Sequence, residues 1–303
     1  MGTPEFAVPG LQSLIADSNF DIVAVFTQPD KAVGRKQTIT PPPVKEVAEI
    51  NNISVCQPIR IRTEIELVKE LRPDLIVVIA YGHIIPQPIL DIPKHGCINV
   101  HASLLPKYRG AACLNAPIRD GEKETGITIM EMEAGLDTGP IIKQEKVAID
   151  KEETLSTLHD KLSKLAAITL PDTLLDYING NITATPQDDA DSSYIGLLKK
   201  EDGLIDWNRP AIEIERLVRA LNPWPSTYTH YQDKTLKIKK VSSEILDINK
   251  HKTGQTFKEN DKLCIQCGQD SLVILSLQTE GKKEMNDKEF LNGNQDFINT
   301  ILS

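Results

Sequence analysis

An asparagine and a histidine at strand spacing, Asn99 and His101, are the side chains of this sequence best suited to chemistry. They alternate with Ile98 and Val100, so in an extended strand both polar side chains point to one face. An amide Nδ2 can donate to a carbonyl oxygen as negative charge develops there, and a neutral imidazole can relay the proton of an attacking amine. The pair is suited to acyl transfer, although most polar residues at strand ends only satisfy local hydrogen bonds.

Two further segments are expected beside this pair. The turn that would end the strand consists of Ser103, Leu104, Leu105 and Pro106. Asp137 follows a second expected strand, 126–132. Because ligands of open α/β sheets bind beyond the carboxyl ends of the strands, we expect these groups to share one site. We predict a direct transfer in which Asn99 and His101 hold the oxyanion and Asp137 orients the imidazole or helps to move protons.

Other classes of chemistry receive less support from the sequence. Ser103 lacks the Gly-x-Ser-x-Gly elbow, and the sequence around Cys97 and Cys113 shows no local activating signature, which disfavours a covalent acyl-enzyme. Cys264 and Cys267 have the spacing of half a zinc site, but a second pair is missing, so we expect no metal. Neither the glycine fingerprint of dinucleotide binding nor a P-loop occurs, so we do not expect nucleotide chemistry of those kinds.

Apolar runs and turn residues predict the organisation of the chain. Short apolar runs alternate with amphipathic stretches through residues 21–150, which is typical of a βαβ parallel sheet. We predict an α/β fold in which residues 1–180 form a Rossmann-like, doubly wound and mostly parallel sheet. A polar linker is expected at 181–199, and the short strands of residues 200–303 predict a small OB-like β-barrel.

Charge and hydropathy limit the partners that the protein can have. A net charge of −9 argues against bulk electrostatic binding of nucleic acid. Lys237 and Lys239 alternate with apolar residues, however, and predict a strand with one cationic face. The start of the sequence has no signal-peptide pattern, and its apolar runs are too short to span a bilayer. We therefore expect a cytoplasmic protein that does not bind membranes.

Motifs along nearly the whole chain resemble the folate-dependent formyltransferases, in the branch that acts on an aminoacyl-tRNA. The matching segments are Gly2-Thr-Pro-Glu-Phe-Ala7, Phe26-Thr-Gln-Pro-Asp30, Gly34-Arg35, Ala80-Tyr-Gly82, Ile98-Asn-Val-His101, Ser103-Leu-Leu-Pro106, Tyr108-Arg-Gly-Ala-Ala112, Gly135-Leu-Asp-Thr-Gly139, Asp206-Trp207 and Arg219-Ala-Leu-Asn-Pro-Trp-Pro225. The Asn-x-His pair with the downstream Leu-Asp-Thr-Gly is specific to this superfamily. The Asn-Pro-Trp-Pro corner and the C-terminal domain point to the tRNA branch.

The resemblance implies an activity and assigns roles to residues. The activity is transfer of the formyl group of 10-formyltetrahydrofolate to the free amino group of initiator methionyl-tRNA, without a covalent enzyme intermediate. Asn99, His101 and Asp137 would carry catalysis, and residues 103–106 would line the folate site. A monomer is expected. Two alternatives remain open: a formyltransferase that acts on an amino sugar nucleotide, and an inactive RNA-binding module.

The resemblance also implies where tRNA would bind. A loop over residues 30–45 would reach the acceptor arm, and the cationic strand of the C-terminal domain would grip the RNA backbone. The expected contacts are Lys31, Arg35, Lys36, Lys237 and Lys239. Lysine and arginine side chains meet phosphates through charge, so this composition suits the task.

Two departures from the family pattern carry expectations of their own. The family usually continues Pro-Ile-Gln where this chain has Cys113-Leu114-Asn115, which shortens one amide beside the pocket. Family members also open with an apolar strand before the Gly-Thr-Pro loop, whereas this sequence starts at the loop. We expect a groove in the core where that strand would pair, and greater stability in a longer version. A start assigned at an internal Met explains the pattern better than a truncated product does.

Overall fold

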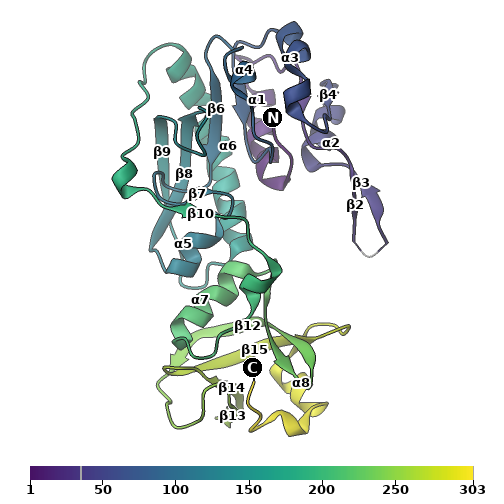
Figure 1. Ribbon diagram of the computed structural model, residues 1–303, viewed down its shortest axis with the longest axis vertical. Helices are drawn as coiled ribbons and strands as arrows, with labels where there is room; N and C mark the ends of the chain where they lie inside the picture. Colours follow the sequence, from purple (N-terminus) through teal and green to yellow (C-terminus); the bar gives the residue numbers. More distant parts are fainter. Residues whose placement is uncertain (35, 303) are drawn as a thin grey trace. The chain divides into compact units, whose positions relative to one another are not determined.

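The computed structural model describes residues 1–34 and 36–302, which form two compact units (Figure 1). The first unit consists of Met1–Cys113, Thr125–Val147 and His159–Ile195, and the second of Leu114–Glu124, Ala148–Leu158 and Gly196–Ser303. The range expected as a linker, 181–199, is divided between them, because residues up to 195 make their contacts within the first unit.

The first unit is a mixed α/β structure with a mostly parallel sheet, as the alternation of apolar runs predicts. Its main strands are β1 (Val25–Phe26), β4 (Val55–Cys56), β5 (Ile76–Val78), β6 (Cys97–His101), β8 (Glu124–Glu131) and β9 (Ile141–Ala148). Strands β1 and β4 pair in parallel, as do β5 and β6, while β6 and β8 are antiparallel. Ile98 and Val100 are buried between the layers, which fixes the register of β6 and therefore the side on which Asn99 and His101 lie.

Helices cover the sheet of the first unit. They are α1 (Val8–Ala16), α2 (Pro43–Ile50), α3 (Ile65–Leu71), α4 (Gln87–Leu90) and α6 (Leu155–Ile178), with short 3-10 turns at Glu5–Ala7 and Ile61–Thr63. Proline occupies the first turn of α1, α2 and α4, where its missing N–H leaves no bond unmade. Leu162, Leu170 and Leu174 form the buried stripe of α6.

Met1 and Gly2 lie between strands β1 and β5. The Met1 α-amine donates to the Val77 carbonyl (2.7 Å), and the Gly2 amide donates to the Phe26 carbonyl (3.0 Å). A cavity of about 140 Å³ lies beside these residues, lined mainly by apolar side chains from the two strands and from helices α1, α2 and α3. Burial lowers the pKa of the Met1 amine to about 5, so folding disfavours its charged form.

The second unit is built on a six-stranded sheet, with α7 and α8 packed against it and α5 packed on α7. Its strands are β11 (Thr227–Tyr231), β12 (Lys234–Leu246), β13 (Thr256–Glu259), β14 (Lys262–Gln266), β15 (Ser271–Thr279) and β16 (Met285–Asn286), and its helices are α5 (Asn115–Asp120), α7 (Ala211–Leu221) and α8 (Asp287–Asn292). The strand order is β11-β12-β15-β14-β13, with β16 beside β15. The expected OB-like barrel is not confirmed, because no pairing joins the edge strands β11 and β13 in the described residues.

Two small strand pairs complete the first unit. Strands β2 (Lys31–Val33) and β3 (Thr38–Thr40) form an exposed hairpin that extends from the unit (Figure 1). Strands β7 (Arg109–Gly110) and β10 (Tyr194–Ile195) pair in parallel, so a segment from the expected linker forms part of the first unit. Polar sequences can join a sheet in this way because the ladder uses backbone groups rather than apolar side chains.

Candidate active site

Strand β6 positions the two polar residues that the sequence singles out. Asn99 pairs with Met130 of β8 and His101 pairs with Thr128, so the two lie on the same face of the sheet. Asn99 is half-buried, whereas His101 is 6% exposed. An imidazole so deeply buried must have polar partners for its ring nitrogens.

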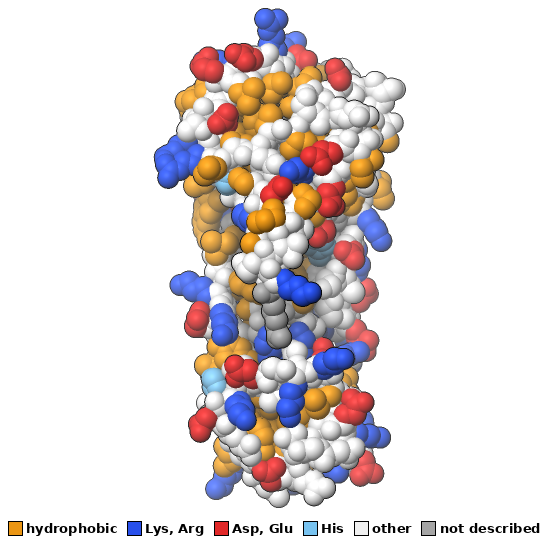
Figure 2. All heavy atoms as spheres, turned by 90° about the vertical axis from the view of Figure 1, so that its right-hand side faces the viewer, with side chains coloured by type: hydrophobic (Ala, Val, Ile, Leu, Met, Phe, Trp, Pro, Cys, Tyr) orange, Lys and Arg blue, Asp and Glu red, His pale blue; other side chains and the backbone are white. Residues whose placement is uncertain are grey.

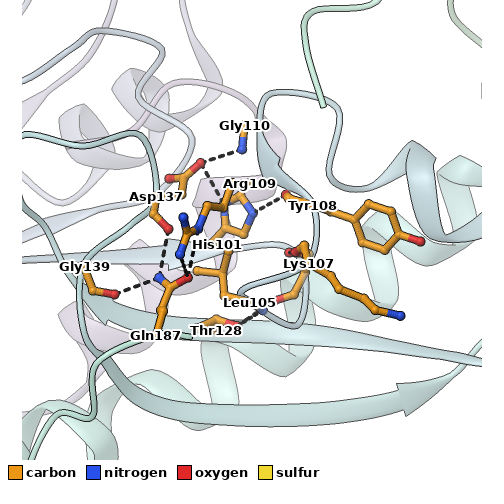
Figure 3. A network of polar contacts seen from close by, with 11 residues as sticks. His101, Leu105, Lys107, Tyr108, Arg109, Gly110, Thr128, Asp137, Gly139 and Gln187 are labelled. Atoms are coloured by element: carbon orange, nitrogen blue, oxygen red, sulfur yellow. Dashed lines mark hydrogen bonds and ion pairs between the residues drawn. The ribbon is translucent and has the colours of Figure 1, made fainter. Parts of the chain in front are cut away.

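The partners of His101 fix its ring and favour its protonated form. The Nε2–H group donates to the Tyr108 carbonyl at 3.0 Å, and Nδ1 lies 3.6 Å from Oδ2 of Asp137 (Figure 3). Burial lowers the pKa of His101, but contacts with Cys113, Asp137 and the Tyr108 carbonyl outweigh it and raise the pKa to about 9. These contacts favour the protonated form of the ring, whereas the sequence suggested a neutral base.

Asp137 is held in place by the backbone around it. Its Oδ2 accepts a hydrogen bond from the Gly110 amide at 2.8 Å, while the same oxygen faces His101. Asp137 has φ +54°, a left-handed conformation that non-glycine residues adopt rarely. Such a conformation persists where surrounding contacts impose it.

The turn after β6 is fixed by hydrogen bonds from neighbouring strands. Thr128 Oγ1 accepts from the Leu105 amide (3.1 Å) and donates to the Ser103 carbonyl (2.6 Å). Gln144 Nε2 donates to the Leu105 carbonyl at 2.8 Å. Ser103 is fully buried and its Oγ donates to the Lys107 carbonyl, so this hydroxyl closes the turn. Leu104 and Pro106 are half-buried at the turn's surface.

Two residues that support the Asp137 loop, Arg109 and Gln187, were not predicted as site residues from the sequence. The Gln187 Nε2 group donates to the carbonyls of Asp137 (2.9 Å) and Gly139 (2.8 Å), and its Oε1 accepts from the buried Arg109 guanidinium (Figure 3). Arg109 belongs to the Tyr-Arg-Gly-Ala-Ala motif, which could have drawn attention to it. Gln187 stands in a polar stretch that offers no such signal.

The residues expected to bind tRNA belong to other elements than those of this network. Lys31, at the start of the β2–β3 hairpin, and Lys36, at its turn, are exposed, and Arg35 lies outside the described residues. Lys237 and Lys239 are half-buried on β12, where Lys239 Nζ donates to Oδ1 of Asn222 at 2.9 Å. Figure 2 shows one face of the molecule, on which acidic and basic side chains are interspersed with hydrophobic ones. Any attraction for phosphate on this face is therefore local.

Two further properties follow from the described part of the chain. None of its groups of His, Cys, Asp or Glu side chains has three members placed to hold a metal ion. None of its helices combines the length and the apolar character needed to cross a membrane.

Comparison with known families decides the relationship of this chain. The model of the family described as formyl transferase matches residues 1–174, and the model of the formyl transferase C-terminal domain matches residues 197–295. The chain belongs to the formyl transferase family. Both parts of the sequence that the motifs single out lie within these matches.

Curated relatives extend along the whole chain. A methionyl-tRNA formyltransferase of Clostridium novyi is 45% identical over 307 residues, which cover all of this chain and 98% of the relative. A methionyl-tRNA formyltransferase of Geobacter sulfurreducens is 45% identical over 303 residues, which cover 97% of this chain and 92% of the relative. By their names these relatives belong to the tRNA branch of the family, which is the branch that the Asn-Pro-Trp-Pro corner indicated.

Solved structures share the fold at lower identity. A sugar 3N-formyl transferase studied with dTDP and 5-N-formyl-THF aligns with a TM-score of 0.67 and 22% identity, covering 93% of this chain and 97% of that one. An N-formyltransferase from Helicobacter canadensis, in complex with folinic acid and dTDP-3-aminofucose, aligns with a TM-score of 0.66 and 20% identity, covering 92% and 97%. At these identities the likeness concerns the fold alone.

Proposed function

We propose that this protein transfers a formyl group from 10-formyltetrahydrofolate to the amino group of initiator methionyl-tRNA. The observation that carries the proposal is the buried His101, held between the Tyr108 carbonyl and Asp137 on the strand that also bears Asn99. Its support from the comparisons is the set of relatives that share 45% of their residues along the full chain and carry that activity in their names.

Asn99 and His101 would stabilise the oxygen of the formyl group. Both can donate hydrogen bonds, Asn99 through its amide Nδ2 and His101 through its protonated ring, and both lie on one face of β6. Donors fixed in advance at the point where negative charge develops are the strongest means of stabilising an acyl-transfer transition state. This donor set fits a formyl donor and requires no nucleophilic side chain.

Asp137 would keep His101 oriented and charged. Its carboxylate oxygen lies 3.6 Å from Nδ1, and it accepts the Gly110 amide, so it cannot turn away without breaking that bond. A negative charge at this distance favours the imidazolium. His101 can release its proton as the leaving nitrogen acquires charge and take up the proton that the attacking amine must lose.

We propose residues 103–106 as the folate contacts. The folate supplies the activated formyl group; the chain supplies a rigid turn whose half-buried residues, Leu104 and Pro106, can face a flat ring system. Thr128 and Gln144 hold the turn from behind through the bonds described above. A turn held in this way loses little freedom when a ligand binds.

Contacts with tRNA are proposed at Lys31, Arg35 and Lys36 near the β2–β3 hairpin and at Lys237 and Lys239 of β12. The exposed side chains of Lys31 and Lys36 can reach phosphates without losing buried partners. Lys239 would have to leave Asn222, so we expect a smaller share of the affinity from it. A cytoplasmic monomer remains our expectation for the working form.

One assay tests the activity and its acceptor together. The purified protein is supplied with 10-formyltetrahydrofolate and, in parallel, with initiator methionyl-tRNA, an amino sugar nucleotide or free methionine. Formylation of the tRNA alone supports the proposal. Formylation of the sugar nucleotide would show that an amino sugar is the acceptor in place of tRNA. If the folded protein formylates none of the acceptors, the proposal is overturned.

A further inference from the structure

Gln187 joins the loop of Asp137 to a buried arginine. Its Nε2 group makes two hydrogen bonds, to the carbonyl oxygens of Asp137 and Gly139, and so binds the loop on both sides of Thr138. Its Oε1 faces the other way and accepts from Nε (3.0 Å) and Nη2 (2.8 Å) of Arg109. One side chain thus uses all of its polar atoms as a bridge (Figure 3).

The loop that Gln187 binds needs such support. Asp137 has φ +54°, and residues in this region carry strain of about 1–3 kcal/mol that neighbouring contacts must offset. Thr138 Oγ1 donates to Glu133 Oε1 at 2.7 Å, but this bond lies in an exposed part of the loop. The two bonds from Gln187 act on the carbonyl of Asp137 itself and on the residue that begins the return to β9.

Arg109 is an unusual anchor because its side chain is almost fully buried. Its exposure is 1%, and its one carboxylate partner, Asp189, is 85% exposed at the side chain. The Gln187 amide oxygen, the Tyr194 hydroxyl (3.0 Å) and the Asp189 carboxylate (2.8 Å) together compensate the burial of its charge. A buried charge with fixed partners is a rigid point to which a loop can be tied.

The chain that follows Gln187 is also hydrogen-bonded to the backbone that contacts His101. The Arg109 amide donates to the Ser193 carbonyl (2.8 Å), and the Tyr108 amide donates to Ser193 Oγ (2.8 Å). The Tyr108 carbonyl in turn accepts from His101. Residues 187–195, which we call the strap, therefore hold two of the groups that contact the His101 ring: Tyr108 through Ser193, and the backbone of Asp137 through Gln187.

We infer that the strap is part of the catalytic apparatus, with Gln187 as a positioning residue that holds the Asp137 carboxylate against His101. This inference rests on the proposed function for its catalytic consequence. The strap lies in the polar range that the sequence presents as a linker, and its role arises from side-chain and backbone bonds to residues about 50 to 85 positions away.

Gln187→Glu is the sharpest test, with Gln187→Leu beside it. The glutamate keeps an acceptor for Arg109 and the length of the side chain, but its oxygens repel the two carbonyls to which Gln187 donates. The leucine removes the bonds without adding charge. We expect both variants to lower kcat about tenfold or more while the KM values for folate and tRNA change less than about threefold, because Asp137 is displaced without any change at the substrate contacts.

A second measurement does not depend on the activity. Titration of His101 by NMR in the folded protein reports whether Asp137 still faces the ring. Asp137, Cys113 and the Tyr108 carbonyl all raise the pKa of His101, so the loss of one contact should change it. We expect the pKa of His101 to fall in Gln187→Leu, which loosens the Asp137 loop without adding a charge of its own. Thr183→Glu is the matched control, because it adds the same charge to an exposed residue near the strap, and it should leave kcat and the titration unchanged.

Each outcome decides a separate point. Variants with the kcat and the His101 titration of the parent protein would overturn the inference. A rise in KM with unchanged kcat would overturn it as well, because it would place Gln187 in substrate binding. A parent protein that formylates no acceptor would overturn the proposed function alone, since the titration would still decide whether the strap holds Asp137.

Discussion

An extension of the chain ahead of Met1 should stabilise the first unit through two separable effects. The Met1 amine is buried between β1 and β5, and its pKa falls from 8.0 to about 5. A peptide N–H in its place carries no charge to bury. An apolar extension can in addition fill the cavity of about 140 Å³ beside it.

The magnitudes follow from the structure. Because the unfolded chain binds the amine proton more tightly, the contribution of this group to stability rises with pH between about 5 and 8. The charge therefore destabilises the fold by about 1 kcal/mol at pH 7 and by roughly 2 to 3 kcal/mol at pH 6. Filling the cavity adds up to about 3 kcal/mol, at about 24 cal/mol per Å³, and does not depend on pH.

The assay compares the chain as it stands, a version with a short apolar extension and a version with a polar extension of equal length. Hydrogen exchange of the β5 and β6 amides reports on the first unit, whereas both tryptophans, Trp207 and Trp224, lie in the second. Both extensions should stabilise β5 and β6 more at pH 6 than at pH 7, and the apolar one should add a constant increment.

The effect of the buried charge and the effect of the cavity can be tested separately. Equal protection in the two extended versions would refute the idea that the cavity accepts an apolar strand. A gain that is the same at both pH values would refute the buried charge as its source. The pKa of His101 affects all three versions alike, so it cancels in the comparison.

Three further results are expected. His101→Ala should lower kcat about 100-fold or more while filter binding shows unchanged tRNA affinity, and unaltered turnover would remove His101 from catalysis. In the parent protein kcat should fall as pH rises through about 9, where His101 loses its proton. Because Cys113 raises the pKa of His101, Cys113→Ala should shift this fall in kcat to lower pH. A fall at the same pH in the variant would refute the contact with Cys113. Gly110→Ala should lower the stability of the first unit by more than about 2 kcal/mol, since its φ is +102° and a Cβ would lie 2.4 Å from the Ile195 carbonyl oxygen. Gly96→Ala, at φ +72° with open space around the Cβ, should cost about half as much in urea denaturation, and equal losses would show that the contact with Ile195 is unimportant.

Features that depend on the local pattern of residues could be predicted from the sequence. The alternation of residues 97–101 fixed a strand, and the burial of Ile98 and Val100 confirms which face is apolar. Asn99 and His101 lie on the other face for the same reason, since side chains in a strand repeat every second residue. The α/β class and the formyl transferase family were likewise predictable, because they rest on short motifs and runs that each residue's neighbours define.

Which distant groups surround those residues depends on the tertiary fold. The sequence presents 187–195 as polar linker, yet Gln187 binds the Asp137 loop and β10 pairs with β7. Nor did it indicate that the fold would raise the pKa of His101, because that depends on burial and on the contacts that Cys113, Asp137 and the Tyr108 carbonyl make. The strand order of the second sheet, in which no pairing closes the expected barrel within the described residues, has the same origin. Strand pairing, burial and electrostatic contacts involve residues that are far apart in the chain. A local pattern of residue types does not indicate which distant residues will meet.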